Sequence, residues 1–284
     1  MSFLRTVFAI TAQNFRKWQT DYRIWMIAVL MIVITLIYVD DVKKLADYLS
    51  ADVPVWIFPF MYSQFYTKAL YILPIILMFC DAPFVDKNQV FTMMRTTRTK
   101  WLCGQILYII FASEVYFLFL LLISLLLTVF YGGFSFEWGT ALTAEAFSNI
   151  SLRIDLHYFL ISRIVVENFT PLLAVFYTFL LSCLGAIFLG MLILMLNLLT
   201  NSRIWGMSVS SVLVVLSITA AKVPRLMPFS PISWTTLNNI DVGGITRNPN
   251  IVYVLTAYAI LIILLIAAIF IFGRKKSLDT KGDQ

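Results

Sequence analysis

Long apolar runs, each close to the length of a membrane-crossing helix, dominate the pattern of this chain. A hydrocarbon layer of roughly 30 Å needs an α-helix of about 20 apolar residues to cross it. Six segments approach that length, with approximate bounds 24–39, 66–82, 101–131, 171–199, 203–221 and 251–273. We therefore predict an all-α polytopic membrane protein with six transmembrane helices in a single domain, residues 1–284.

The composition supports this prediction. Of the 284 residues, 61% are hydrophobic and only 13% are charged, and the mean hydropathy is +0.88. Soluble domains carry about 25% charged residues, so the composition excludes a soluble enzyme, a nucleic-acid binder and a disordered protein as descriptions of the whole chain. The 21 Lys and Arg residues outnumber the 15 Asp and Glu residues, and we attribute this excess to the basic cytoplasmic loops of a membrane protein.

The distribution of basic residues predicts the orientation. An even number of spans places both termini on one side of the membrane. That side carries 13 Lys and Arg residues, and the opposite side carries 8. Because cytoplasmic loops are enriched in Lys and Arg, both termini are predicted to be cytoplasmic.

The first 22 residues predict an amphipathic helix that lies in the cytoplasmic interface of the membrane. Within residues 3–22, apolar side chains recur at helical spacing while basic side chains cluster elsewhere. The apolar positions are Phe3, Val7, Phe15, Trp18 and Tyr22, and the basic ones are Arg5, Arg16 and Lys17. The alternative interpretation is a frayed basic terminus.

The cytoplasmic connection between the second and third spans predicts a short helix. Asp86 followed by Gln89 is a capping-box pattern, in which the carboxylate accepts from a backbone N–H of the first turn. The predicted helix carries an apolar face of Val90, Phe91 and Met94 beside the cations Arg95 and Arg98. Such a face suits docking of a soluble partner. Equally, it could pack on the spans of the protein itself or on lipid head groups.

Two segments on the opposite side give mixed patterns. Residues 132–170 combine a period-two alternation at 150–157 with a helix-like run, so their secondary structure stays undecided. Residues 222–250 contain three prolines that prevent one long helix, yet they are too apolar for a free loop. We predict a pair of short helices at 226–240 that dips back toward the membrane under a cover of protein.

Polar residues inside the spans are few. Glu114 lies in the third span, where a carboxylate either lines a polar pathway or bonds to a neighbouring polar side chain. Asn197, near the cytoplasmic end of the fourth span, is predicted to donate a hydrogen bond between helices. Small residues recur every four positions at Ser182, Ala186 and Gly190, which indicates close helix packing within the chain or at a subunit interface.

Catalytic and metal-binding motifs are absent from the sequence. It has no G-x-x-x-x-G-K-[ST] motif, so the chain by itself cannot hydrolyse ATP in the manner of a P-loop protein. The single histidine, His157, has no neighbours at metal-ligand spacing, and the three cysteines match neither a zinc site nor a redox pair. We therefore predict no catalytic residues, no metal site and no enzymatic activity of the chain alone.

The stretch TTRTKWLCGQ at residues 96–105, together with the order of the elements, resembles the permease subunits of type-2 ABC exporters. In that family a serine–arginine pair precedes a glycine–lysine pair at the third span. Arg98 and Gly104 match this pattern, whereas Gln105 stands where lysine is usual. The resemblance covers nearly the whole chain in layout and identifies residues 1–284 as one permease domain.

The resemblance implies a division of labour between subunits. Such permeases form homo- or heterodimers, and each docks a separate ABC ATPase subunit, on which ATP and Mg are bound. The helix at about 86–97 would be the coupling helix, and the N-terminal helix would also touch the ATPase. No cofactor binds the permease directly. The implied partners are the ATPase, the second permease subunit and membrane lipid, with no nucleic acid.

The resemblance also implies a substrate pathway and a location. The cavity in this family is lined mostly by the first, second and fifth spans, with the segment at 226–240 as its lid. The residues implied to face the pathway are Tyr66, Tyr71, Phe79 and Met207, to which Glu114 is added as the one carboxylate well inside a span. The expected substrate is hydrophobic or amphipathic: a peptide, a lipid-like molecule or a drug. The expected location is the cell membrane of a bacterium.

Two other classes of protein remain open. An ATP-independent channel or secondary transporter needs a polar route through the spans, and Glu114 alone is a poor one. A membrane-embedded enzyme needs a nucleophile and a base that converge at one depth, and the sequence does not reveal such a pair.

Overall fold

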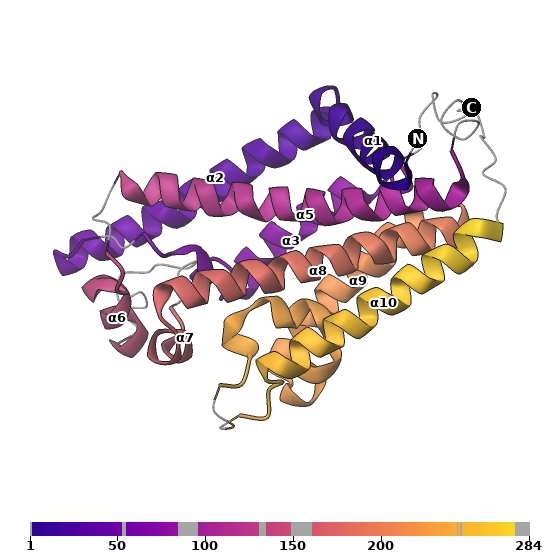
Figure 1. The fold of residues 1–284 in the computed structure, drawn as a ribbon. Helices are drawn as coiled ribbons and strands as arrows, with labels where there is room; N and C mark the ends of the chain where they lie inside the picture. The colour runs from indigo at the N-terminus through magenta and orange to yellow at the C-terminus, as the bar shows by residue number, and fades with distance from the viewer. Residues whose placement is uncertain are drawn as a thin grey trace.

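The computed structural model describes residues 2–52, 55–84, 96–130, 135–148, 161–242, 244 and 246–275. This part of the chain is helical and contains no strand (Figure 1). The α-helices are α1 Phe3–Arg16, α2 Tyr22–Leu49, α3 Phe65–Phe79, α5 Arg98–Val129, α6 Gly139–Ser148, α7 Arg163–Asn168, α8 Pro171–Thr200, α9 Arg203–Lys222 and α10 Ile251–Lys275. The 3₁₀ helices are η1 Lys17–Gln19, η2 Phe58–Phe60, η4 Pro224–Phe229, η5 Pro231–Thr235 and η6 Leu237–Asn239.

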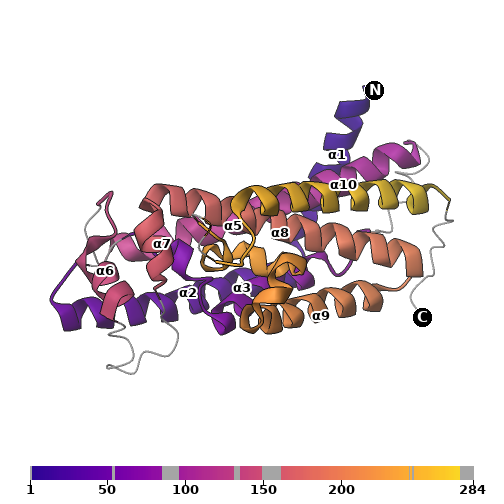
Figure 2. The same cartoon turned by 90° about the horizontal axis from the view of Figure 1, so that it is seen from below.

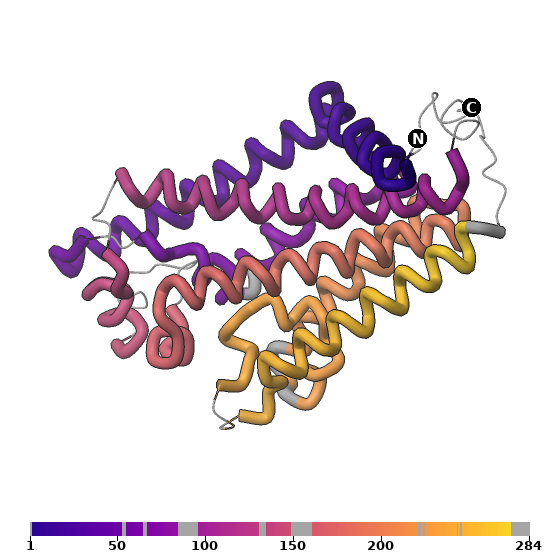
Figure 3. Tube along the Cα trace, in the orientation of Figure 1, coloured from indigo at the N-terminus to yellow at the C-terminus, as the bar shows by residue number. Residues whose placement is uncertain are grey.

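Five helices, α2, α5, α8, α9 and α10, are long and apolar enough to cross a membrane, which indicates a membrane-embedded protein. They run roughly along one axis of an elongated bundle, and α5 and α8 lie side by side in it (Figures 2 and 3). The predicted span 66–82 forms α3, which has only 15 residues and contains Pro74. Its length of about 22 Å falls short of a roughly 30 Å layer. The described part of the chain therefore contains five helices of spanning length, where the sequence predicted six.

The predicted bounds agree with the helices to within three residues, except at the end of the first span. There the helix continues from residue 39 to Leu49, although the added turns contain five charged residues. Lys44 pairs with Asp40 at 2.7 Å, while Val42 and Leu45 are fully buried on the other face. The apolar stripe of the helix thus continues beyond the apolar run, which is why hydropathy alone ended this element too early.

Helix α8 is the centre of the bundle and packs against α3, α5, α9 and α10. Small residues on it permit this contact. A Cβ placed on Gly190 would lie 2.6 Å from Cγ2 of Ile109, and one on Gly185 would lie 2.6 Å from Cγ2 of Thr235. The small-residue stripe of the fourth span therefore serves packing within the chain.

The segment after α9 is folded as η4, η5 and η6, where the sequence predicted two short helices at 226–240. It packs on α8 and α9, and the indole of Trp234 is buried and donates to the carbonyl of Met227 at 2.7 Å. The hydroxyl of Tyr258, on α10, donates to the carbonyl of Pro231 at 2.6 Å. Three prolines prevent a long helix here, and each of the first two 3₁₀ helices begins at one of them.

Part of the segment 132–170 forms two short helices, α6 and α7. The alternating stretch at 150–157, which includes His157, lies outside the described residues.

Candidate functional site: a polar network at the C-terminal end of α3

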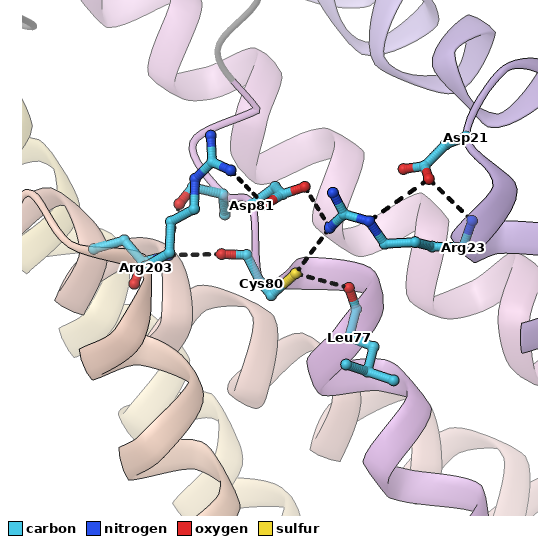
Figure 4. A network of polar contacts seen from close by, with 8 residues as sticks. Asp21, Arg23, Leu77, Cys80, Asp81 and Arg203 are labelled. Atoms are coloured by element: carbon cyan, nitrogen blue, oxygen red, sulfur yellow. Dashed lines mark hydrogen bonds and ion pairs between the residues drawn. The ribbon is translucent and has the colours of Figure 1, made fainter. Parts of the chain in front are cut away.

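Asp81, just after the end of α3, joins two other helices through ion pairs (Figure 4). Its carboxylate lies 2.6 Å from Nη1 of Arg23 at the start of α2 and 3.0 Å from Nη1 of Arg203 at the start of α9. Arg23 is also fixed by a contact at the start of α2. Its backbone N–H donates to the carboxylate of Asp21, the N-cap of this helix. The N-terminal ends of α2 and α9 and the C-terminal end of α3 are therefore tied at one point.

A buried amide ties the same turn to α8. The Nδ2 group of Asn197 donates to the carbonyl oxygens of Cys80 at 3.1 Å and Ala82 at 2.7 Å. Its Oδ1 accepts from the backbone N–H of Gly206 at 3.2 Å, and a Cβ at Gly206 would lie only 2.3 Å from that oxygen. The prediction that Asn197 donates a hydrogen bond between helices is confirmed.

The 3₁₀ helix η1, which directly follows α1, contacts the same region. Nζ of Lys17 donates to the carbonyl of Phe84 at 2.8 Å. The Phe84 ring packs edge-on against Tyr108 of α5, with ring centroids 4.7 Å apart. The hydroxyl of Tyr108 in turn accepts from the indole of Trp18 at 2.7 Å. Phe84, the last described residue of this turn, is therefore held by both η1 and α5.

Helix α1 also packs directly on the beginning of α5. The Thr11 hydroxyl donates to the carbonyl of Gly104 at 3.1 Å, and the Asn14 amide donates to Oε1 of Gln105 at 3.2 Å. A Cβ on Gly104 would lie 2.7 Å from Cγ2 of Ile10. Gly104 and Gln105 of the TTRTKWLCGQ stretch thus have a structural role in this chain, since α1 packs against both of them.

Most of the predicted docking helix lies between these two anchored ends. Asp86, Gln89, Val90, Phe91, Met94 and Arg95 lie outside the described residues, and Arg98 is the first residue of α5. The described structure therefore fixes where the connection leaves α3 and where it enters α5.

A polar pocket of about 360 Å³ adjoins this network. It is lined by three cationic side chains and two carboxylates, namely Lys17, Arg23, Arg203, Asp21 and Asp81. Among the described residues, no group of three or more His, Cys, Asp or Glu side chains is placed to hold a metal ion.

The residues predicted to face a substrate pathway have different environments. Tyr71 and Phe79 are fully buried in the core of the bundle, Met207 is half-buried against it, and Glu114 is exposed on α5. The side chain of Tyr66 lies outside the described part. The four described side chains come from three helices, and the structure does not gather them around one cavity.

A buried aromatic segment was missed by the sequence analysis. Residues 55–62 are buried between α5 and the η5–η6 region, and Thr236 donates to the carbonyl of Tyr62 at 3.2 Å. The Tyr62 ring lies 5.5 Å from that of Tyr71, and its buried hydroxyl has no hydrogen-bond partner among the described residues. The available signal was the apolar run VWIFPFMY, which is too short for a span but too apolar for an exposed loop.

The polar network predicts a contrast in stability between two variants. Asp81 and both arginines are partly exposed, so Asp81→Asn is expected to change the free energy of unfolding by less than about 1 kcal/mol. Asn197→Leu removes three buried hydrogen bonds and is expected to cost about 1–2 kcal/mol. Thermal unfolding of both purified variants in the same detergent measures the difference. Equal melting temperatures would contradict the assigned role of Asn197.

Comparison with protein-family models, with characterised proteins and with solved structures finds no match to this chain. The fold and the network define a helical membrane protein in which the ends of α2, α8 and α9 converge on the turn after α3. Its function is argued below from that geometry and from the sequence.

Proposed function

We propose that this protein is the transmembrane subunit of an ATP-driven exporter of the type-2 ABC class. It would move a hydrophobic or amphipathic substrate across the cell membrane of a bacterium and would act with a separate ATPase and a second permease subunit. In this proposal α3 and the following turn form the sixth crossing, and both termini are cytoplasmic.

The observation that carries the proposal is the anchoring of the connection between α3 and α5. At its first end, the turn at 80–84 contacts η1, α2, α8 and α9 through Lys17, Arg23, Asn197 and Arg203. At its second end, the first turns of α5 are hydrogen-bonded to α1. A protein that pulls or pushes on residues 85–95 would therefore act on most of the inner helix ends together.

Such an arrangement supports coupling to an external motor. The chain has no nucleotide-binding motif of its own, so the energy for active transport has to come from a partner or an ion gradient. Ion coupling usually relies on charged or unwound sites near the middle of the membrane. The ion pairs described here lie instead at the inner helix ends, next to the proposed docking segment.

The direct test is ATP-dependent transport by the purified chain together with its ATPase. The protein is expressed with the ATPase subunits of the same organism, and the ATPase that co-purifies with it is identified. Proteoliposomes containing both chains are then expected to export a hydrophobic dye when ATP and Mg are supplied. Transport by the chain alone, without an ATPase, would contradict the proposal and favour a channel or a secondary transporter.

The topology gives a second test. In a variant in which the three native cysteines are replaced, Arg95→Cys is expected to react with a membrane-impermeant maleimide only after the cells are opened. Glu137→Cys is the matched control, because this exposed residue precedes α6 on the opposite side and should react in intact cells. Labelling of Arg95→Cys in intact cells would rule out a cytoplasmic docking segment.

A further inference from the structure

An apolar groove runs along the outer surface of the bundle between α2 and α5. Its volume is about 230 Å³. Ala28 and Met31 of α2 line one wall, and Val115 and Phe119 of α5 line the other. A pocket for a drug-sized molecule has a volume of roughly 300–1,000 Å³. The groove is smaller than that, and its size suits a single hydrocarbon chain.

The groove adjoins the polar pocket beside Asp81. Trp18, Ile24 and Met78 line both cavities. An apolar space thus lies next to a space lined by basic and acidic side chains. A ligand that fills both has to be amphiphilic, with its polar end toward the inner ends of the helices.

Exposed aromatic residues indicate how deep in the membrane the boundary between the two cavities lies. Tyr22 is 75% exposed and Trp25 is 62% exposed, and such side chains are typical of the membrane–water boundary. Met31, at the far end of the groove on α2, lies six residues or about 9 Å deeper. The polar pocket is therefore at head-group level, and the groove extends to the level of the acyl chains.

The two arginines of the pocket retain hydrogen-bonding capacity. Asp81 contacts Nη1 of both Arg23 and Arg203, so one carboxylate is shared between two guanidinium groups, each of which has five N–H donors. Arg203 is also well exposed, at 64% of its side chain. Guanidinium groups bind phosphate oxygens with good geometry, and basic pockets at the cytoplasmic side of membrane helices suit anionic head groups.

We infer that this composite cavity is a binding site for an anionic phospholipid of the inner leaflet. One acyl chain occupies the groove between α2 and α5, and the phosphate lies against Arg23 and Arg203. This inference does not depend on ATP-driven transport, and the lipid would bind whether or not an ATPase is present.

Photolabelling of the purified full-length chain in nanodiscs tests the site. The probe is phosphatidylglycerol with a diazirine on one acyl chain, present as a trace in phosphatidylcholine. Adducts are expected on residues 24–31 and 115–119. Ala28→Trp, which fills the groove, is expected to reduce these adducts about tenfold, since a single chain cannot enter a filled groove. Val29→Trp is the matched control, because this neighbour is exposed and does not line the groove.

The head-group contact has its own readout. The wild type is expected to favour the phosphatidylglycerol probe over the same probe in phosphatidylcholine by about fivefold, and Arg203→Gln is expected to remove most of this preference. Arg225→Gln is the control, since Arg225 is exposed on η4 and outside the pocket. These two variants keep the groove intact, so the test does not depend on the folding of Ala28→Trp.

Three results would overturn the inference. The first is equal labelling of the Ala28→Trp and Val29→Trp variants. The second is a photo-cross-link from the groove to another copy of the chain in place of lipid, which would make the face a subunit interface. The third is loss of the head-group preference on addition of inorganic phosphate at matched ionic strength, which would make the pocket a site for free phosphate.

Discussion

A leucine in place of Gly190 is expected to destabilise the bundle more than any other single change considered for this protein. A Cβ alone would lie 2.6 Å from Cγ2 of Ile109 and 2.9 Å from Cδ2 of Phe79, and both of these residues are buried. Neither side chain has open space to move into, so α5, α3 and α8 have to separate. We expect a loss of roughly 3 kcal/mol in the free energy of unfolding, at the upper end of the usual cost of overpacking.

The measurement is thermal unfolding of purified Gly190→Leu in detergent, followed by tryptophan fluorescence. Ala267→Leu is the matched control, because Ala267 lies on the exposed face of α10, where a larger apolar side chain meets lipid. Gly190→Ala should fall between the control and the leucine variant. If Gly190→Leu melts at the same temperature as the wild type, the close contact of α8 with α5 and α3 is wrong.

The second large effect concerns coupling and depends on the proposed function. The double variant Phe91→Glu with Met94→Glu replaces two apolar side chains of the predicted docking face by carboxylates. If these side chains are central to the contact with the ATPase, their loss costs about 2 kcal/mol or more of binding energy. We therefore expect ATP-dependent transport to fall more than tenfold while the chain remains folded.

The readouts are dye export from proteoliposomes and retention of the ATPase on the immobilised permease. Tyr48→Glu is the control, since this residue is 59% exposed near the C-terminal end of α2, outside the predicted span 24–39 and away from the docking segment. A variant that keeps both its ATPase and its transport would contradict docking at residues 85–95. The proposed lipid site is tested by photolabelling. The result of that test is therefore independent of the transport result.

The sequence predicted the long helices well because their signal is local. A run of 20 or more apolar residues has to be a helix in a membrane, whatever its neighbours are, since its backbone polar groups cannot bond to water there. For this reason the bounds of α5, α8, α9 and α10 agree with the predicted segments. The same reasoning underestimated the length of α2, because its last turns are charged on one face and buried on the other.

The polar network shows why a site of this kind is harder to predict. Arg23, Asp81 and Arg203 are 58 and 122 residues apart along the chain, and each alone is an ordinary charged residue near a helix end. Asn197 was an exception, because an amide near the end of an apolar helix requires a partner wherever it lies. The partners themselves, the carbonyls of Cys80 and Ala82, carry no sequence signal at all.

The apolar content and its spacing alone determined that this is a helical membrane protein, because burial in lipid depends on the length and composition of each segment separately. The tertiary structure decided which helix ends meet at Asp81, that residues 55–62 enter the bundle, and that an apolar groove between α2 and α5 adjoins a polar pocket. These features depend on contacts between distant segments. Such contacts follow from packing geometry and close approach at small residues, which no local pattern encodes.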